Sequence, residues 1–348
     1  MQENWFQLIQ HFNVNDAFVL ATICATRGST YQKTGTMMLI SAEGSCTGLL
    51  SGGCLEADIS LHAQQVLIDN KTRIINYDLK ADSELLWGLG LGCDGAIDIL
   101  LQPLTPANNH LDFVSVISAV QSRNTGFYCQ KIGDNTTPAA SYITSNKGVE
   151  NLDKLLHEFN ESLDKDASIL VVPITPPIAV VICGAGPDAE PVAQLLLQMG
   201  WQVEIWDHRQ QYLDQACFSH CQKKKIRPEQ ICENDFSAFD AAVVMTHNLE
   251  SDTSLIEKAW QSSLSYIGVL GPKGRRNKLI EPIGLTQSQI QGRLYGPIGL
   301  DLGGRGPQAI ALSIAAQIQQ HFSIAAQAQD HAHAPIQSIM SYIYNTQQ

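Results

Sequence analysis

One cysteine in the sequence stands in a setting that can make its thiol reactive. Residues 44–56 run from a glycine turn through a short apolar strand to Gly52, Gly53 and Cys54. Apolar residues follow at helical spacing, so Cys54 is expected to be the first residue of a helix, with Glu56 in its first turn. Helix N-termini favour thiolate over thiol, and the two glycines leave the backbone open to a ligand. The competing interpretation is a buried cysteine that only packs.

A second glycine-rich segment also carries a cysteine. Residues 87–95 read WGLGLGCDG, and a strand is predicted directly after them. Four glycines within nine residues indicate tight backbone geometry, which could bring Cys93 and Asp94 close to a ligand. The alternative is a flexible glycine loop in which the cysteine is incidental.

A dinucleotide-binding pattern begins at residue 178. An apolar strand at 178–183 runs into a turn with Gly184 and Gly186 in G-x-G-x-x-A spacing, and a helix and a second strand ending at Asp207 follow. This succession within about 30 residues predicts a Rossmann-type domain. Asp207 could accept hydrogen bonds from a ribose diol and favour NAD over NADP, a preference that the nearby Arg209 weakens.

Later strands at 241–246 and 266–270 extend the predicted parallel sheet, and ligands bind at the carboxyl ends of such strands. His247 follows the first of them and could act as an acid or base, although a polar residue that closes a strand is the commoner role. Arg305 lies between two glycines before a predicted helix and could contact an anion. A basic loop at 271–278 suits an oxyanion or is simply solvated, and it contains Lys273, Arg275, Arg276 and Lys278.

The composition excludes several classes of function. A net charge of −12 disfavours nonspecific binding to nucleic acid. No stretch approaches the roughly 18 apolar residues of a membrane span and no export signal is evident, so we expect a cytoplasmic protein. Nine scattered cysteines indicate reduced thiols, and the Cys217-x3-Cys221 spacing is weak evidence for zinc. Walker A, H-E-x-x-H and G-x-S-x-G sequences are absent, which leaves no support for hydrolysis.

The 348 residues suffice for about two domains. The predicted fold class is α/β, with an N-terminal α+β domain at 1–105 and a C-terminal Rossmann-like domain with a parallel sheet at 176–322. We expect an intervening α/β segment and linker at 106–175. The predicted final helix runs from Pro307 to about Gln319, and the tail at 323–348 is expected to be partly disordered.

Together, the motifs resemble those of the XdhC/CoxI family over residues 15–320. They are SGGCLE at 51–56, WGLGLGCDG at 87–95, CGAG at 183–186, TH at 246–247, IGVLGPK at 267–273 and GPIGLDLG at 296–303. Members are accessory proteins of molybdenum hydroxylases such as xanthine dehydrogenase. Two positions depart from the family pattern: Tyr31-Gln32 replaces a customary Pro-Arg, and residues 303–309 read GGRGPQA.

The resemblance implies that the protein binds molybdenum cofactor, protects it while a cysteine desulfurase supplies sulfur, and inserts it into the apoenzyme. Such a protein is a chaperone or maturation factor rather than a turnover enzyme. We hypothesise that Cys54 lies close to the molybdenum, with Gly52, Gly53 and Glu56 also binding the cofactor and Cys93 assisting. The Rossmann turn and the basic loop hold the anionic end. A homodimer is expected. The alternatives are an NAD-dependent oxidoreductase and a nucleotide-sensing regulatory module.

Overall fold

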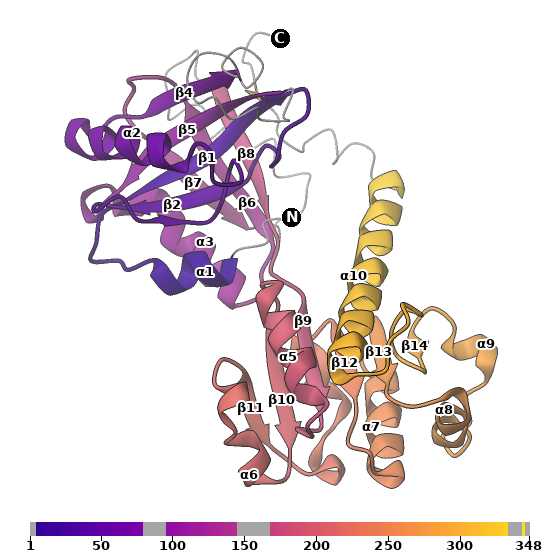
Figure 1. The fold of residues 1–348 in the computed structure, drawn as a ribbon. Coiled ribbons are helices and arrows are strands. Elements are labelled where there is room, and N and C mark those ends of the chain that lie inside the picture. Colours follow the sequence, from indigo (N-terminus) through magenta and orange to yellow (C-terminus); the bar gives the residue numbers. More distant parts are fainter. Residues whose placement is uncertain (1–4, 79–94, 145–167, 333–342, 345–348) are drawn as a thin grey trace. The chain divides into compact units, whose positions relative to one another are not determined.

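The computed structural model describes residues 5–78, 95–144, 168–332 and 343–344, and the chain divides into two units (Figure 1). The first unit comprises residues 1–176 together with 333–348, and the second comprises residues 177–332. Residues 106–144, which the sequence analysis set apart as an intervening segment, belong to the first unit.

A five-stranded antiparallel sheet forms the centre of the first unit, in the order β3-β2-β1-β5-β4. Helix α2 (Glu56–Asp69) lies on one face, where Ile59, Ala63 and Val66 are buried against the sheet. The strands are β1 (Phe18–Arg27), β2 (Met37–Ser41), β3 (Cys46–Thr47), β4 (Arg73–Asp78) and β5 (Ala96–Leu104).

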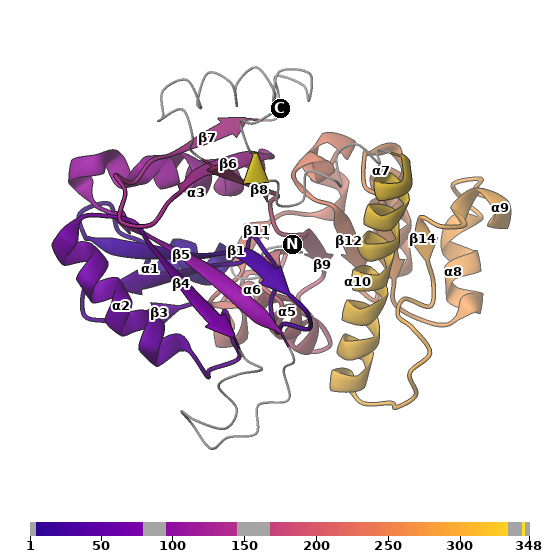
Figure 2. The same cartoon turned by 90° about the horizontal axis from the view of Figure 1, so that it is seen from above.

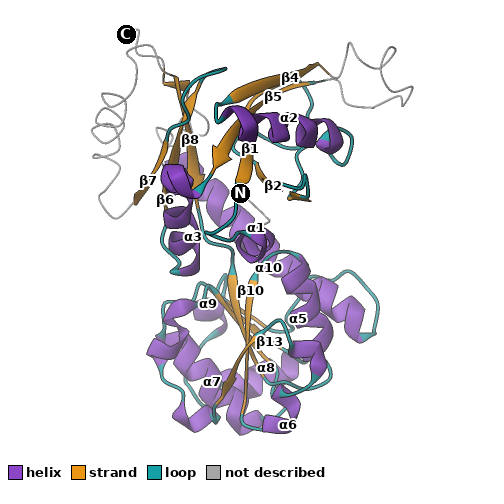
Figure 3. Ribbon diagram, turned by 90° about the vertical axis from the view of Figure 1, so that its left-hand side faces the viewer, coloured by secondary structure: helices purple, strands orange, loops and turns teal. Residues whose placement is uncertain are grey.

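A second sheet, in the order β15-β8-β6-β7, packs on the other face of the first (Figure 3). Leu20 and Leu100 of the first sheet share a buried core with Tyr128 and Val172 of the second, which explains why the intervening segment belongs to this unit. Its strands are β6 (Gly126–Ile132), β7 (Ala140–Thr144), β8 (Ser168–Ile174) and β15 (Ile343–Tyr344). Three helical segments complete the unit: α1 (Trp5–His11), η1 (Pro106–Asp112) and α3 (Phe113–Gln121).

The second unit is a six-stranded parallel sheet in the order β11-β10-β9-β12-β13-β14. Numbered within the unit, this order is 3-2-1-4-5-6, the doubly wound arrangement of dinucleotide-binding domains. The Rossmann-like domain predicted from the glycine turn is therefore confirmed. Its strands are β9 (Ala179–Cys183), β10 (Gln202–Asp207), β11 (Gln222–Lys225), β12 (Ala241–Val244), β13 (Tyr266–Val269) and β14 (Leu294–Tyr295).

Helices cover both faces of this sheet (Figure 2). Alternate residues of β9 enter two cores: Val180 packs with α5 and α10, and Val181 packs with α7 and α8. This alternation is what a sheet buried on both faces requires. The helices are α5 (Ala189–Gln198), α6 (Gln210–Leu213), α7 (Leu249–Gln261), α8 (Lys273–Ile280), α9 (Gln287–Ile290) and α10 (Pro307–Ala332), and the short 3-10 turns are η4 (Ala216–Phe218), η5 (Pro228–Gln230) and η6 (Glu233–Ala238).

Two sequence-based expectations for this unit are wrong. Most of the basic segment predicted as a loop is helix α8, which begins at Lys273. Helix α10 continues past Gln319 to Ala332, because the alanines and glutamines that follow favour helix. In addition, Ile343–Tyr344 of the expected tail pairs with β8 of the first unit. Within the described ranges, no helix is long and apolar enough to cross a membrane.

Candidate functional site

The helix after the glycine-cysteine motif begins two residues later than predicted. Leu55 is the N-cap and Glu56 the first helical residue of α2, so the placement of Cys54 at the first helical position is wrong. Gly52 and Gly53 have φ values of +78° and +100°, which lie outside the helical region. The N–H group of Leu55 donates to Ser51 Oγ at 2.8 Å. Cys54 therefore lies on an exposed loop next to the cap.

The side chain of Glu56 folds back onto this loop and fixes its shape. Its Oε1 atom accepts hydrogen bonds from the N–H groups of Leu50 (3.0 Å) and Ser51 (2.8 Å). The Oε2 atom accepts from the hydroxyl of Ser51 (2.6 Å) and the N–H group of Leu55 (3.2 Å). Burial opposes ionisation, but the donors on Ser51 and Leu50 outweigh it and lower the pKa of Glu56. Glu56 is thus an ionised residue that shapes the loop.

The backbone beside Cys54 is open to a ligand. The N–H groups of Gly52, Gly53 and Cys54 form no hydrogen bond with any residue that the structure describes. A methyl group on Gly53 would meet nothing within 4 Å, and one on Gly52 would lie 3.4 Å from the ring of Tyr31. Tyr31, which replaces part of the family's Pro-Arg step, is 59% exposed. An exposed thiol, these three donors and an aromatic ring thus share one surface.

Cys93 and the rest of residues 79–94 lie outside the described residues. The described chain resumes at Gly95, where a methyl group would lie only 2.3 Å from the carbonyl oxygen of Ser29. Ser29 lies two residues after Arg27, whose guanidinium is held by both oxygens of Asp98 at 2.8 and 2.9 Å. Gly95 thus packs against the segment that leads to Tyr31.

In the second unit, the glycine turn after β9 requires its first glycine. Gly184 has a φ of +115°, and a methyl group there would lie 2.6 Å from the carbonyl oxygen of Met245. Gly184 donates to the carbonyl oxygen of Trp206, and Ala185 donates to Asp207 Oδ2, both at 2.8 Å. Two N–H groups of the turn are therefore used internally. Gly186 is less confined, with His247 3.9 Å from an added methyl group.

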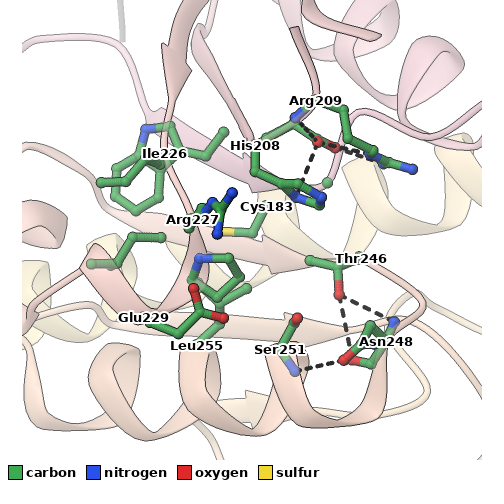
Figure 4. A pocket seen from close by; sticks show the side chains of 15 residues that line it. Cys183, His208, Arg209, Ile226, Arg227, Glu229, Thr246, Asn248, Ser251 and Leu255 are labelled. Atoms are coloured by element: carbon green, nitrogen blue, oxygen red, sulfur yellow. Dashed lines mark hydrogen bonds and ion pairs between the residues drawn. The ribbon is translucent and has the colours of Figure 1, made fainter. Parts of the chain in front are cut away.

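Arg209, which is labelled in Figure 4, forms an ion pair with Asp207 beside this turn. Asp207 Oδ1 accepts from the backbone N and Nε of Arg209 at 2.8 and 2.9 Å, and Oδ2 accepts from Nη2 at 2.7 Å. Burial opposes ionisation, but the Arg209 and Ala185 donors prevail and lower the pKa of Asp207 to about 2. With four donors on one carboxylate, a ribose diol could bind Asp207 only by displacing one of them.

His247 follows β12 with a left-handed φ of 63°. Its Nε2 atom lies 3.5 Å from Asp188 Oδ2, in the turn before α5, and the histidine side chain is exposed. The structure therefore places the predicted acid-base candidate next to the glycine turn, together with a carboxylate that the sequence analysis did not consider.

The basic side chains after β13 do not converge on one ligand site. Arg275 Nη2 lies 2.7 Å from Oδ2 of the buried Asp252, and its Nη1 donates to the carbonyl oxygen of Leu270. Arg276 donates to the side chain of Gln287 at 2.8 Å. The remaining basic groups, Lys273, Lys278 and Arg305, are exposed. Of the basic candidates in this unit, these last three side chains are the most available to an anion.

A pocket of about 490 Å³ opens beside Asp207, at the carboxyl ends of β9, β10 and β12. Arg227 and Ser251, which no sequence motif indicates, also line it. Arg227 follows the edge strand β11, whose Lys223–Lys225 stretch carries no signal for a site in the sequence alone. In the part of the chain that the structure describes, no three His, Cys, Asp or Glu side chains are grouped to hold a metal ion.

The fold and these sites define a class: a Rossmann-domain protein with an additional α+β unit that presents an exposed, glycine-flanked thiol. The chain belongs to the XdhC and CoxI family. Residues 13–78 match that family itself, and residues 180–318 match the XdhC Rossmann domain.

Similar proteins span most of the chain. It is 31% identical to a Bacillus subtilis protein named as a probable subunit of xanthine dehydrogenase, over 87% of this chain and 92% of that protein. It is 21% identical to the molybdenum cofactor insertion chaperone PaoD of Escherichia coli, over 86% and 82%. A crystal structure described as a xanthine dehydrogenase from Bacillus halodurans covers 92% of this chain and 96% of its own, with a TM-score of 0.75 and 26% identity.

Proposed function

We propose that the protein is a chaperone that binds molybdenum cofactor, holds it during sulfuration and inserts it into a xanthine dehydrogenase-type hydroxylase. Family membership supports this proposal, as do two similar proteins, one named as a probable subunit of xanthine dehydrogenase and the other as a molybdenum cofactor insertion chaperone. The structural observation that carries it is the exposed Cys54 thiol beside three N–H groups that pair with no described residue.

The chemistry of this surface fits such a cargo. Molybdenum cofactor combines a metal centre bearing oxo and sulfur ligands with a phosphorylated pterin. A thiolate is a suitable ligand for a soft metal centre, so Cys54 is the group assigned to the molybdenum end. The N–H groups of Gly52 and Gly53 can donate to an anionic oxygen. Tyr31 offers a ring on which a flat heterocycle can stack.

Glu56 acts through the loop rather than on the cargo. Its carboxylate accepts hydrogen bonds from the N–H groups of Leu50, Ser51 and Leu55. The N–H groups of the three residues between Ser51 and Leu55 do not donate to it and remain for a ligand. An alanine at this position would free the first set and let the loop relax. The carboxylate therefore keeps the thiol and its neighbouring donors in one arrangement.

The other groups have supporting roles in this proposal. Cys93 assists Cys54 at the molybdenum end of the cargo. The sulfur is supplied by a cysteine desulfurase, and the chaperone acts as a homodimer. An NAD-dependent oxidoreductase remains the rival function, but it gives no role to the exposed thiol loop.

The test is anaerobic co-expression with an apo-hydroxylase, followed by measurement of retained pterin and molybdenum and of hydroxylase activation. Cys54→Ser is expected to lower all three by about tenfold or more, because removing a metal ligand costs at least as much as removing its supporting contacts. Cys232→Ser is the matched control, since Cys232 is also an exposed thiol but lies in the second unit. Wild-type pterin retention and activation in Cys54→Ser, or tight NAD binding without any pterin, contradicts the proposal.

A further inference from the structure

The pocket beside Asp207 has the size and lining of a nucleotide site (Figure 4). Its volume of about 490 Å³ is within the usual range for small-molecule pockets. Figure 4 places His208 and Arg209 along one side and Asn248 and Ser251 along the other. Ile226 and Leu255 add apolar surface, on which a flat heterocycle can lie. Position and lining together suit the base and ribose of a nucleotide.

The pairing of Asp207 changes which ribose this pocket accepts. A free carboxylate at the end of the second Rossmann strand binds the 2′-hydroxyl and repels a phosphate at that position. Here the carboxylate is held by Arg209 through three hydrogen bonds, so its charge is neutralised within the protein. The usual repulsion of a ribose phosphate by this carboxylate is therefore reduced.

Arg209 is fixed with one edge of its guanidinium unused. Asp207 holds Nε and Nη2, and the ring of Tyr212 lies 3.9 Å from the guanidinium carbon. No described residue accepts a hydrogen bond from Nη1. A guanidinium held in place on two sides loses little freedom when it binds an anion.

Two more cationic or ionisable groups line the same pocket. Arg227 is exposed and forms no ion pair with any residue in the described ranges, and the His208 ring lies 3.6 Å from Asp207 Oδ1. Glu229 also lines the pocket, and its carboxylate can accept a hydrogen bond from the exocyclic amino group of a base. Beside the Arg209–Asp207 pair, Arg227 is the cation that can meet a phosphate, and Glu229 is the carboxylate that can meet the base.

We propose that this pocket binds an adenosine whose ribose carries a phosphate at its 2′ or 3′ position, as in NADP(H) or coenzyme A. The base lies against Ile226 and Leu255, and the ribose phosphate lies between Arg209 and Arg227. This proposal concerns the second unit alone and does not depend on molybdenum cofactor binding, so the two proposals fail independently.

The test is titration calorimetry on the full chain with adenosine 2′,5′-bisphosphate, adenosine 3′,5′-bisphosphate and 5′-AMP. At least one bisphosphate is expected to bind about tenfold or more tightly than AMP, because hydrogen bonds to a charged group are stronger than those to a hydroxyl. A preference for the 2′ compound indicates NADP(H), and a preference for the 3′ compound indicates coenzyme A. Equal affinity for all three, or no bisphosphate binding at millimolar concentration, overturns the proposal.

Substitutions test whether the preference for a bisphosphate over 5′-AMP arises in this pocket. Arg227→Ala is expected to reduce the difference between bisphosphate and AMP to about threefold or less, while Arg227→Lys retains part of it because the charge remains. Lys223→Ala is the matched control, since Lys223 is an exposed cation on the neighbouring strand β11 and does not line the pocket. A wild-type preference in Arg227→Ala, or an equal loss in Lys223→Ala, contradicts the assignment.

Discussion

Replacing Arg275 by alanine is expected to lower the free energy of unfolding of the second unit by about 3 kcal/mol. Asp252, its partner, is 0% exposed, and the other carboxylate oxygen accepts hydrogen bonds from the N–H and hydroxyl groups of Thr246. The variant would leave this buried carboxylate without a cation. The pair also ties the segment after β13 to α7, so its loss would affect the carboxyl-end edge of the sheet.

The magnitude follows from the surroundings of the pair. Arg275 Nη2 and Asp252 Oδ2 are 2.7 Å apart without good hydrogen-bond geometry, so their attraction is mainly coulombic. Removing one partner of a buried ion pair costs about 3–5 kcal/mol. The lower end applies here because the Arg275 side chain is 22% exposed and water screens part of the interaction.

Hydrogen exchange against urea concentration, measured in peptides from β12 and α7, reports the stability of this unit separately. Arg276→Ala is the control, because the hydrogen bonds of Arg276 go to exposed amide side chains, and we expect a change below about 0.5 kcal/mol. The double variant Arg275→Ala with Asp252→Asn should recover part of the loss by removing the unpaired charge. If Arg275→Ala keeps the wild-type stability but no longer binds an anionic ligand, then Arg275 binds that ligand and does not stabilise the unit.

Two further predictions concern the carboxylates of the two candidate sites. Glu56→Ala should lower the free energy of unfolding of the first unit by about 1 kcal/mol, a value reduced because the Glu56 side chain is partly exposed. The control Asp69→Ala, at the other end of α2, should change this free energy by less than about 0.5 kcal/mol. Equal effects of the two variants in urea unfolding would contradict the role of Glu56 in shaping the loop. The folded-state pKa of Asp207 is about 2, below its ordinary 3.8, so its stabilisation is present above pH 3.8 and lost as the pH falls towards 2. As the pH falls from 3.8 towards 2, the denaturation midpoint of the second unit should therefore decrease more steeply in the wild type than in Asp207→Asn. If the midpoint has the same pH dependence in both proteins, the pairing of Asp207 with Arg209 does not cause the loss of stability in acid.

Local signals were enough to predict the Rossmann unit. The glycine spacing at Gly184, the apolar strand before it and Asp207 at the end of the next strand all belong to one short stretch of chain. The start of helix α2 is different, because a side chain decides it: the carboxylate of Glu56 binds the loop before it. The periodicity of the apolar residues carries no information about that contact.

Other features depend on partners far apart in the sequence. Strand β11 (QKKK) contains no apolar residue, yet it pairs with β10 at the sheet edge and brings Arg227 to the pocket. The sequence shows four cations after β13, but not that Asp252 is buried beside one of them. Gly274 argues against a helix in that segment, yet it lies inside α8 (Lys273–Ile280).

The central position of β9 also has a consequence for the order in which the pocket forms. Ala179 pairs with Gln202, only 23 residues later, whereas Val180 pairs with Ala241, 61 residues later. Closing the longer connection costs about 0.9 kcal/mol more in chain entropy. We expect the Arg209 side of the pocket to form first and the Asn248 side to form later. A nucleotide that contacts both sides would then stabilise the pairing of β12 with β9 and slow the loss of that pairing.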